Sequence, residues 1–595
     1  MTMADQSETP VALNRAVLSL IGGLAGLSFW LLSDKLESLI DNPQAYLFLS
    51  ALGVAFFASV LAMAGPLSVG RAVLSGLVVA LVAAALLTWA SLRFDVTDDF
   101  MRTGHPLAAF AVIVSIPLPF LIAAQRPDEG WRSYPALFNH AWTIVVRYAA
   151  AWLFVGVFWG VLMLSNGLLQ IVGLTVIEDL LKIDAVPWVV TGLVLGLAIA
   201  VVNELSDYVS PYLILRLLRL LLPVVLLVMV VFIAALPFNG LSGLFGGLSA
   251  AFTLLVMALA GITLVSTALD RSDEEAVHSP AMRLFTQALA LLLPVMAALA
   301  GYAIWERVAQ YGWTPDRLAG ASVAVVVAAY ALLYAVSVLW HQRWMARIRR
   351  INTAMALAVV VGAMLWLTPL INPQRLATAD QLARYRSGEV SARALDLWSI
   401  GRQWGRAGQA GIARLAANRE GPDAALLQDR LTRLKDATSR SEFEREARDA
   451  AAEETLAQVL ALLPIVSAPD PMARKVLEIL PPYQLRDLRD ACRRKTAAGN
   501  PGCVLLIADF LPAYPGKEAV LAYRPRPQSL RWQSFRSAGQ GVAAVGSRLL
   551  SPDGTLRVGR PAIGMIDALV AGDYSIEPVD MKALHTKDGI LFIVP

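Results

Sequence analysis

Long apolar runs separated by short polar stretches occupy the first 371 residues of the chain. Each run has about 18 to 24 mostly apolar residues, enough for a helix to cross roughly 30 Å of hydrocarbon. Eleven such runs lie at residues 14–33, 45–64, 72–92, 107–124, 142–166, 187–204, 213–236, 250–268, 281–304, 318–340 and 352–371. The pattern therefore predicts an α-helical polytopic membrane domain of about eleven transmembrane helices over residues 1–371.

The positions of basic residues predict how these helices are oriented. The segment His341–Arg350 lies between the last two runs and carries four arginines and no acid. Arginines beside a membrane segment stay on the cytosolic side, so the final run should cross outward. With the N-terminus inside, cytosolic loops and helix starts hold about twelve Lys and Arg residues and the opposite loops about six. We therefore predict a cytoplasmic N-terminus; losing the weakest run, 187–204, would invert this orientation.

After Ile371 charged residues become frequent and apolar positions become periodic. Residues 380–417, 424–463 and 472–495 are predicted to be helices, with a proline-rich boundary at 464–471. Short apolar or alternating runs predict strands at 503–510, 519–523, 530–535, 541–550, 556–558 and 589–594. We expect a helical extramembrane region over 372–465 and a small α+β extramembrane domain over 466–595, both on the periplasmic face of a bacterial inner membrane.

Composition supports the membrane assignment. Hydrophobic residues make up 57% of the chain and charged residues 16%, with a mean hydropathy of +0.58, which lies outside the range of soluble globular proteins. The formal net charge of +4 is small for 595 residues, and the basic groups collect at membrane edges. We therefore predict the lipid bilayer as the surroundings of the chain and no nucleic-acid partner.

The two cysteines of the chain, Cys492 and Cys503, both lie in the predicted outer domain. The turn-forming residues 499–502 can reverse the chain and bring the two Cα atoms within the roughly 4.4 to 6.8 Å that a disulfide requires. An oxidising periplasm would preserve such a bond. We predict a disulfide; the alternatives are two free thiols in a cytosolic domain and a redox-active pair, which the long spacing disfavours.

Prolines inside the predicted spans mark a candidate ligand site. Pro117 and Pro119 remove two backbone donors from the fourth span and are expected to break it. Pro223 and Pro294 occur in matching Leu-Leu-Leu-Pro-Val segments about 70 residues apart, as in a weak parallel repeat. A broken helix can hold a substrate or an ion, although proline kinks are also common in spans that bind nothing.

Charged residues at the span edges have structural alternatives as well. Arg147 lies about one turn inside the fifth span, where we expect its side chain to snorkel toward the cytosol. Glu204 and Asp207 are expected to form an interfacial ion pair with Arg216 or Arg219, in preference to a proton relay. Two pairs of glycines spaced four residues apart should let helices approach closely: Gly22 with Gly26, and Gly192 with Gly196.

Residues 307–317 read Arg-Val-Ala-Gln-Tyr-Gly-Trp-Thr-Pro-Asp-Arg. Tyr311 and Gly312 should form a turn, and Thr314 should cap the next helix, with Pro315 and Asp316 in its first turn. This structural role accounts for the residue types in the segment. The alternative is that the segment binds a ligand through Arg307, Tyr311 or Arg317.

The same segment resembles the Arg-x-x-x-Tyr-Gly-x-Thr-x-x-Arg signature of a family of bacterial membrane proteins, the domain-of-unknown-function 4153 family. The resemblance extends over roughly residues 130–400 and includes Leu137, Phe138 and Trp142. It implies a polytopic envelope protein, and it carries no accepted activity.

Common catalytic motifs are missing from the sequence. There is no H-E-x-x-H, Cys-x-x-Cys, phosphate-loop or G-x-S-x-G pattern, and we predict no metal or cofactor. Asp95, Asp98 and Asp99 form an acidic cluster in a predicted outer loop, where a metal-dependent glycosyltransferase would need carboxylates around a divalent ion. A short loop rich in aspartate is usually only solvated, so the catalytic residues stay unknown.

Basic residues are in surplus between positions 486 and 560, and acids are few there. They include Arg493, Arg494, Lys495, Arg524, Arg526, Arg531, Arg536, Arg548, Arg557 and Arg560. Such a surface could rest on anionic lipid or on an anionic envelope polymer; the alternative is an ordinary solvated basic face.

Three functions remain open on the sequence alone. The first is an envelope scaffold or sensor, without enzymatic activity, whose outer domain binds a protein partner. The second is a secondary transporter that uses the proline-containing spans. The third is an enzyme resembling membrane glycosyltransferases.

Overall fold

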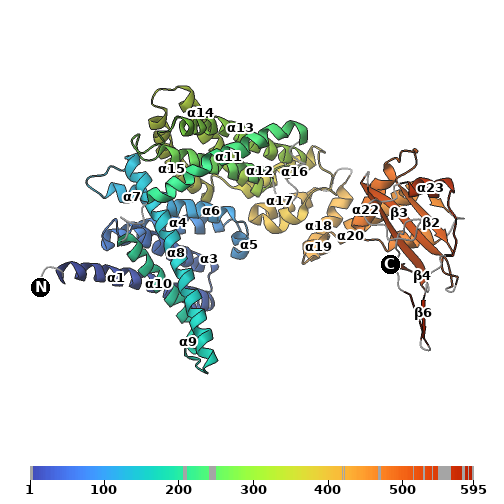
Figure 1. The fold of residues 1–595 in the computed structure, drawn as a ribbon, viewed down its shortest axis with the longest axis horizontal. Helices are drawn as coiled ribbons and strands as arrows, with labels where there is room; N and C mark the ends of the chain where they lie inside the picture. The colour runs from blue at the N-terminus through green and yellow to red at the C-terminus, as the bar shows by residue number, and fades with distance from the viewer. Residues whose placement is uncertain are drawn as a thin grey trace. The chain divides into compact units, whose positions relative to one another are not determined.

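The computed structural model describes residues 5–204, 211–239, 250–418, 420, 423–466, 471–512, 515–526, 529–538, 541–546, 564–578, 583–586 and 589–592. They form two compact units, Met1–Lys435 and Asp436–Pro595. The first unit is helical, and the second combines helices with a mixed β-sheet (Figure 1).

The long helices of the first unit follow the predicted apolar runs. In chain order the elements are α1 (Asp5–Trp30), η1 (Leu31–Leu36), α2 (Glu37–Leu39), α3 (Pro43–Met63), α4 (Val69–Ser91), α5 (Thr97–Met101), α6 (His105–Ser115), α7 (Pro117–Ala124), α8 (Tyr134–Ile171), α9 (Val176–Leu181), α10 (Ala185–Glu204), α11 (Pro211–Asn239), α12 (Ala250–Leu269), α13 (Pro280–Tyr311), α14 (Pro315–Leu339) and α15 (Trp344–Leu367). Among the described residues, 11 helical segments are long and apolar enough to cross a membrane. The predicted number is confirmed, and the run at 187–204 is one of them.

Local sequence explains where α3 begins. The Asn42 side chain accepts hydrogen bonds from the backbone N–H groups of Gln44 and Ala45, and Pro43 occupies the first turn of α3. Asparagine at this position pairs donors that the helix leaves unpaired, and proline has no donor to lose there.

The fourth span is interrupted where the sequence predicts it. α6 ends at Ser115 and α7 begins at Pro117, so Ile116 separates two helical pieces that together span His105–Ala124. Pro223 and Pro294 behave differently, because they lie inside the continuous helices α11 and α13. Among the spans that the structure describes, the fourth is the one that is interrupted at a proline.

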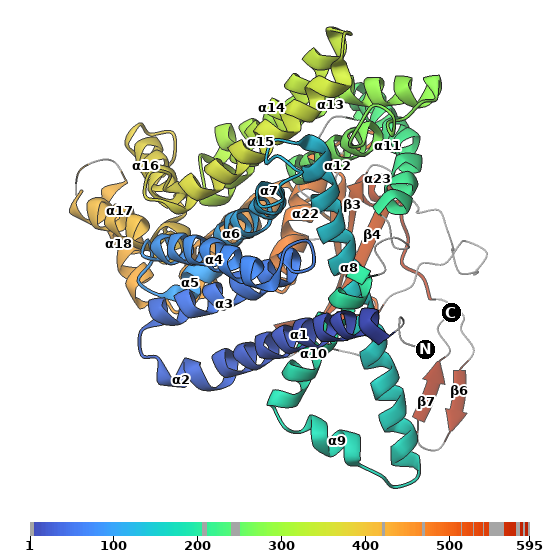
Figure 2. The same ribbon diagram turned by 90° about the vertical axis from the view of Figure 1, so that its left-hand side faces the viewer.

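Helices α1 and α10 approach each other at backbone distance. A Cβ atom added to Gly22 would lie 2.1 Å from the Gly192 carbonyl oxygen, and one added to Gly196 would lie 2.1 Å from the Leu18 oxygen. Figure 2 shows the two helices side by side. The glycine pairs therefore perform the predicted packing role, since any side chain would separate the helices.

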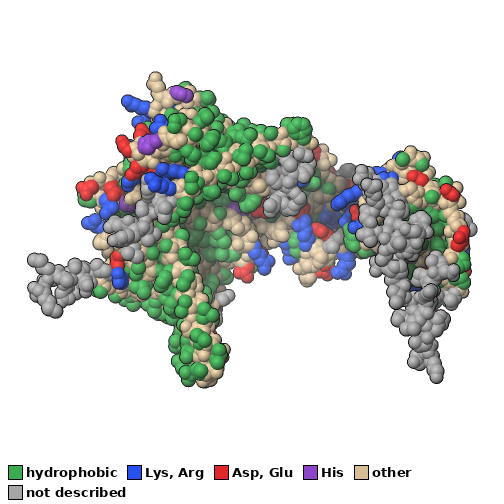
Figure 3. Space-filling model, viewed as in Figure 1, with side chains coloured by type: hydrophobic (Ala, Val, Ile, Leu, Met, Phe, Trp, Pro, Cys, Tyr) green, Lys and Arg blue, Asp and Glu red, His purple; other side chains and the backbone are tan. Residues whose placement is uncertain are grey.

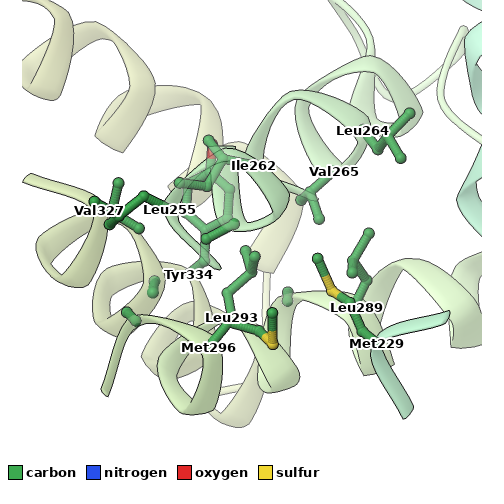
Figure 4. Close-up of a cluster of buried hydrophobic side chains, with 14 of the residues drawn as sticks. Met229, Leu255, Ile262, Leu264, Val265, Leu289, Leu293, Met296, Val327 and Tyr334 are labelled. Carbon is green, nitrogen blue, oxygen red and sulfur yellow. The ribbon is translucent and has the colours of Figure 1, made fainter. Parts of the chain in front are cut away.

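We call α1–α10 the first helix set and α11–α15 the second helix set. The second set shares one apolar cluster, to which α11, α12, α13, α14 and α15 all contribute buried side chains. Figure 4 shows side chains from the first four of these helices converging in it. In the first set, α8 is 38 residues long, and large hydrophobic side chains such as Leu153, Leu164 and Ile171 are exposed along it. The space-filling view shows this apolar surface (Figure 3), which suits lipid.

The helices after residue 371 are shorter than predicted. The predicted helix 380–417 is wrong as a single element: the structure has α16 (Pro373–Arg386), the short π-helix η2 (Ser399–Gln403) and α17 (Gly405–Ala417). Gly388 and Gly405 have positive φ angles of 80° and 55°, which glycine adopts without strain and which end regular helix. The predicted helix 424–463 is likewise three helices, α18 (Ala424–Asp436), α19 (Arg440–Phe443) and α20 (Arg445–Leu462), because Ser439 caps a new start at the Glu442 N–H.

The second unit is built on one five-stranded sheet with the order β1-β2-β3-β4-β5. Its strands are β1 (Ile465–Val466), β2 (Cys503–Ala508), β3 (Glu518–Arg526), β4 (Ser529–Ala538) and β5 (Gly541–Val545). β1 pairs with β2 in parallel and the other neighbours are antiparallel. A hairpin of β6 (Ala583–Thr586) and β7 (Gly589–Phe592) follows the helix α23 (Met565–Ala571).

The core of this unit lies between the sheet and three helices: α20, α21 (Met472–Glu478) and α22 (Pro482–Arg493). The predicted helix 472–495 is wrong as a single element, because Pro481 and Pro482 start a second helix within it. Strand β1, strand β6 and helix α23 were not predicted, and the predicted strand 556–558 lies outside the described residues.

The predicted disulfide between Cys492 and Cys503 is present, with the two Cα atoms 4.9 Å apart. It joins the end of α22 to the start of β2, and both residues belong to the apolar core. The intervening chain turns at Gly499, whose φ is 86°. The bond therefore holds a helix and the sheet together at the centre of the unit.

Candidate functional site: a cavity between the two helix sets

A cavity of about 930 Å³ lies between the first and second helix sets. α6, α7 and α8 line it on one side, and α12, α14 and α15 line it on the other. Most of its wall is apolar, and its large apolar side chains include Phe120, Phe138, Trp142, Val327 and Val359. The lining contains no Lys, Arg, Asp or Glu side chain among the described residues. Apolar ligands suit such a wall, because burying apolar surface away from water is favourable.

One end of the cavity carries a cluster of neutral polar side chains. Asn352 donates from its Nδ2 to the Tyr134 hydroxyl and to the Ser266 Oγ, each at 3.2 Å. Its Oδ1 accepts a hydrogen bond from the Tyr334 hydroxyl. The Ser266 and Tyr334 hydroxyls lie 3.0 Å apart. Since Tyr334 donates to Asn352, we assign the Ser266 hydroxyl as the donor to Tyr334, which closes a ring of three residues with Tyr134 attached.

The opposite end carries a second neutral contact between the sets. Trp366 Nε1 of α15 donates to His105 Nδ1 of α6 at 3.0 Å, and the two rings meet edge to face. Beside them Arg93 donates to the carbonyl oxygens of Trp366 and Thr368, both at 2.8 Å. Burial lowers the pKa of Arg93 to about 10, which leaves it charged at neutral pH.

Charges lie behind the polar cluster, at the end of α12. Asp270 adopts a left-handed conformation with φ of 50° and pairs with Arg219 of α11. Arg349 of α15 donates to the Leu269 and Asp270 carbonyl oxygens and pairs with Asp273 at 2.6 Å. These contacts fix α11, α12 and α15 together, and so they hold Ser266 and Asn352 in register.

This network corrects one prediction. Glu204 pairs with Arg15 at 2.5 Å, and Arg219 pairs with Asp270. The prediction failed because α10 lies against α1, which brings Arg15 to the end of α10, while α11 packs on α12 and brings Arg219 to Asp270. Asp207 lies outside the described residues.

Arg147 also lies elsewhere than expected. Its side chain does not snorkel but is 1% exposed. It donates to the carbonyl oxygens of Leu61, Ala62 and Ala64 at the end of α3, and to Asn203 Oδ1 at 3.2 Å. The last carbonyls of a helix have no partner within it and carry partial negative charge. They therefore compensate the guanidinium without a carboxylate.

The signature segment performs the predicted structural role. Gly312 ends α13 with a φ of 74°, and Thr314 Oγ1 accepts from the Arg317 N–H at 3.2 Å. The Arg317 side chain donates to the Gly312 carbonyl at 2.6 Å and lies over the Tyr311 ring, as does Arg307.

Side chains of helix α16 form hydrogen bonds with the loop between α13 and α14. Asp380 accepts a hydrogen bond from the Trp313 N–H at 2.8 Å. Gln381 donates to the carbonyl oxygens of Tyr311 and Trp313, at 2.9 and 3.2 Å. The signature therefore forms the joint between the α13–α14 hairpin and the first helix after the last span.

The three aspartates of the predicted acidic cluster do not come together at one site. Asp95 pairs with Arg406 at 2.8 Å, while Asp98 and Asp99 stand in the first turn of α5. Among the residues that the structure describes, no group of three or more His, Cys, Asp or Glu could hold a metal ion.

The proline residues relate to the cavity unequally. Pro119 lines it beside Ile116, at the break between α6 and α7. Pro294 lines a separate pocket of about 390 Å³ together with Trp305 and Trp313. Pro117, Pro223 and Arg147 are not among the residues that line either pocket. The broken fourth span thus contributes Ile116 and Pro119 to the cavity wall, whereas Pro117, Pro223 and Pro294 do not line the cavity.

Sequence reasoning missed the polar cluster itself, which consists of Tyr134, Ser266, Tyr334 and Asn352. The usable signal was Asn352, a polar amide at the start of the final apolar run. A buried polar side chain needs a partner, but its partners come from helices up to 218 residues away in sequence.

In the second unit, the basic residues that the structure describes are mostly exposed. Arg493, Arg494, Lys495, Arg526 and Arg531 are exposed, and Arg524 and Arg536 are half-buried. Arg548, Arg557 and Arg560 lie outside the described residues.

Comparison with known proteins gives one match. The model of a family described as "Domain of unknown function (DUF4153)" matches residues 22–415. Neither the curated proteins nor the solved structures gave a match.

Proposed function

This chain belongs to the domain-of-unknown-function 4153 family of proteins, and we propose that it is a multi-pass membrane sensor or scaffold that binds an apolar ligand in its cavity. The chain is an integral membrane protein, with 11 helices suited to spanning a bilayer. The observation that carries the proposal is the cavity of about 930 Å³ between the helix sets.

The size and chemistry of the cavity fit a lipid-like molecule. Ligand pockets commonly have volumes of roughly 300 to 1,000 Å³ and are mostly apolar with a few placed polar groups. This cavity has that composition, with a polar cluster at one end and the hydrogen bond of Trp366 with His105 at the other. A long-chain amphiphile would place its chain along α6 and α15 and its polar end near Asn352.

The position of the cavity supports a sensing role. It separates the two helix sets, which hydrogen bonds join at either end of it, through Asn352 and through Trp366. α15, which contributes both residues, is followed after a short connection by α16. Since α16 holds the signature loop, a ligand that displaces α15 would also shift the contact between α16 and that loop.

We place the second unit in the periplasm of a bacterium with the chain anchored in the inner membrane. The disulfide between Cys492 and Cys503 supports this, because such bonds persist in oxidising compartments. The arginine-rich segment 341–350 supports it as well, since cytosolic arginines before the final span send that span outward. There the unit would bind a protein partner, and its exposed basic residues would contact anionic lipid or an anionic envelope polymer.

Cysteine labelling tests the placement. Intact cells are treated with a maleimide before and after reduction, and a reporter is fused to the C-terminus. The expected result is labelling only after reduction, and a reporter active only outside the cytosol. Labelling without reduction, together with a reporter active in the cytosol, would overturn the placement.

A substitution that fills the cavity tests ligand binding. An added Cβ at Gly362, which lines the cavity, meets no heavy atom within 4 Å, so Gly362→Leu should occupy the cavity without a clash. Gly156→Leu on α8 is the matched control, because Gly156 also has open space and does not line the cavity. Native mass spectrometry should show co-purified lipid with the wild type and the control but not with Gly362→Leu. Equal lipid on all three proteins would contradict the proposal.

Transport of the bound molecule is the second candidate function. The observation in its favour is the break at Ile116, which lies in the cavity wall, and interrupted helices commonly line transport sites. Proteoliposomes distinguish the two functions: a transporter moves a labelled amphiphile between leaflets, whereas a sensor binds it without moving it.

A further inference from the structure

The hydrogen bonds in the cavity indicate what kind of ligand oxygen it would bind. The Asn352 side chain uses both amide hydrogens, one to Tyr134 and one to Ser266. Ser266 and Tyr334 each donate within the ring described above. Tyr134 only accepts there, so its own hydroxyl hydrogen has no acceptor among the residues that the structure describes.

Tyr330 presents a second unused donor. It lies one helical turn before Tyr334 on α14, its ring meets the Tyr334 ring edge to face at 5.9 Å, and it lines the cavity. Its hydroxyl has no hydrogen-bond partner among the described residues, and it is half-buried. Two phenolic donors are thus available at or near the polar end.

The remaining hydroxyl groups of the wall are already used. Ser115, Thr263, Ser322 and Thr353 each donate to the backbone carbonyl four residues earlier in their own helix. Since a hydroxyl has one hydrogen to donate, these groups cannot donate to a ligand without giving up that bond. Among the hydroxyl groups of the wall, the free donors are therefore Tyr134 and Tyr330. At the opposite end the His105 Nε2–H also has no partner among the described residues.

Charge restricts the ligand further. No cationic side chain lines the cavity among the described residues, and Arg219 and Arg349 behind the cluster are held by Asp270, Asp273 and backbone carbonyls. An anionic headgroup would lose its hydration without gaining a paired charge. A neutral oxygen acceptor would lose less and would receive the two phenolic hydrogens.

We propose that the cavity selects a neutral long-chain lipid with a carbonyl or ester oxygen, which accepts hydrogen bonds from Tyr134 and Tyr330. The proposal rests on the ligand-binding function proposed above.

The test compares two probes of equal chain length, methyl oleate and a hydrocarbon alkene, on the purified full-length protein in micelles. Native mass spectrometry measures the occupancy of each probe in competition. One hydrogen bond is worth on the order of 1 kcal/mol, or roughly fivefold in affinity. The wild type should therefore prefer methyl oleate by about fivefold or more, and sodium oleate should compete poorly.

Variants identify the donors. The double variant Tyr134→Phe, Tyr330→Phe should lose the preference for methyl oleate over the alkene. Tyr148→Phe is the control, because the Tyr148 hydroxyl donates to the Ala58 carbonyl at 2.7 Å and does not line the cavity. It should keep the preference.

The outcomes separate this inference from the ligand-binding function. Equal binding of ester and alkene to the wild type, or an unchanged preference in the double variant, overturns the inference and leaves an apolar ligand site. If the wild type binds neither probe, and Gly362→Leu retains as much lipid as Gly156→Leu, the proposed function fails together with it.

Discussion

The two helix sets are held together by different interactions. In the first set, α1 and α10 meet at backbone distance through glycines, and the buried Arg147 is bound by carbonyl groups and an amide. In the second set, α11, α12 and α15 are joined by ion pairs of Arg219 with Asp270 and of Arg349 with Asp273. Arginine thus serves both sets. In the first set the buried Arg147 is bound by helix-end carbonyls and an amide, while Arg15 pairs with Glu204 at the end of α10. In the second set the arginines at the end of α12 bind carboxylates as well as carbonyls.

The boundary between the sets is of a third kind. It contains the cavity and is bridged at the Asn352 end by a neutral side-chain hydrogen bond with Tyr134. At the other end it is bridged by the hydrogen bond of Trp366 with His105, by the Arg93 guanidinium, and by Leu367, which packs in the apolar cluster of the first set. Charged or backbone-close contacts are costly to rearrange, whereas neutral side-chain hydrogen bonds contribute about 1 kcal/mol each. A ligand at the Asn352 end would therefore meet the contact between the sets that is easiest to rearrange.

The largest effect is expected at Arg147. Arg147→Met leaves carbonyl oxygens at the end of α3 without their donor in a buried site, which should lower the free energy of unfolding by about 3 kcal/mol. Denaturant titration in mixed micelles measures this. Arg147→Lys keeps the charge and should lose less. A stability of Arg147→Met equal to that of the wild type would mean that the first set does not depend on this contact.

Arg349 should matter less than Arg147. Arg349→Met removes donors from the Leu269 and Asp270 carbonyls, but Asp273 can be hydrated, because its side chain is 68% exposed. Asp270 also keeps Arg219. We expect a loss of about 2 kcal/mol in the same titration. A loss greater than that of Arg147→Met would reverse the comparison between the sets.

Glycine substitutions sharpen the comparison of packing. In Gly192→Ala the new Cβ meets the Gly22 carbonyl oxygen, so the helices must separate, at a cost of about 1 to 2 kcal/mol. In Gly261→Ala of the second set the nearest atom is the end of the flexible Leu293 side chain, at 2.8 Å, and the cost should be smaller. Thermal unfolding of both variants decides the order, and a larger loss for Gly261→Ala would contradict the account.

The smallest effect is expected at the boundary. Trp366→Phe removes the hydrogen bond to His105 and should cost about 1 kcal/mol or less. The same variant should change the spacing of α6 and α15, as measured by the distance between spin labels on the two helices. A stability loss as large as that of Arg147→Met would show that the boundary is as firmly held as the sets.

Much of this architecture could be predicted from the sequence, because about 20 adjacent apolar residues are enough to identify a span. All 11 spans, the cap at Thr314, the turn at Gly312 and the break at Pro117 depend on neighbouring residues. The partners of Arg147 could not be predicted, since the carbonyls that bind it lie 83 to 86 residues earlier in the chain. The cavity could not be predicted either, because six helices contribute to its wall. Amphipathic helices after residue 371 were predicted as too long, since periodicity continues across breaks at Gly388 and Ser439.

The central claim is that the cavity between the helix sets holds an apolar ligand. An electron cryomicroscopy map of the protein in lipid nanodiscs tests it most directly. The account predicts elongated density that belongs to no side chain, lying between α6, α7 and α8 on one side and α12, α14 and α15 on the other, with its polar end beside Tyr134 and Tyr330. Side chains of the two sets in direct contact throughout this region, with no space between them, would contradict it.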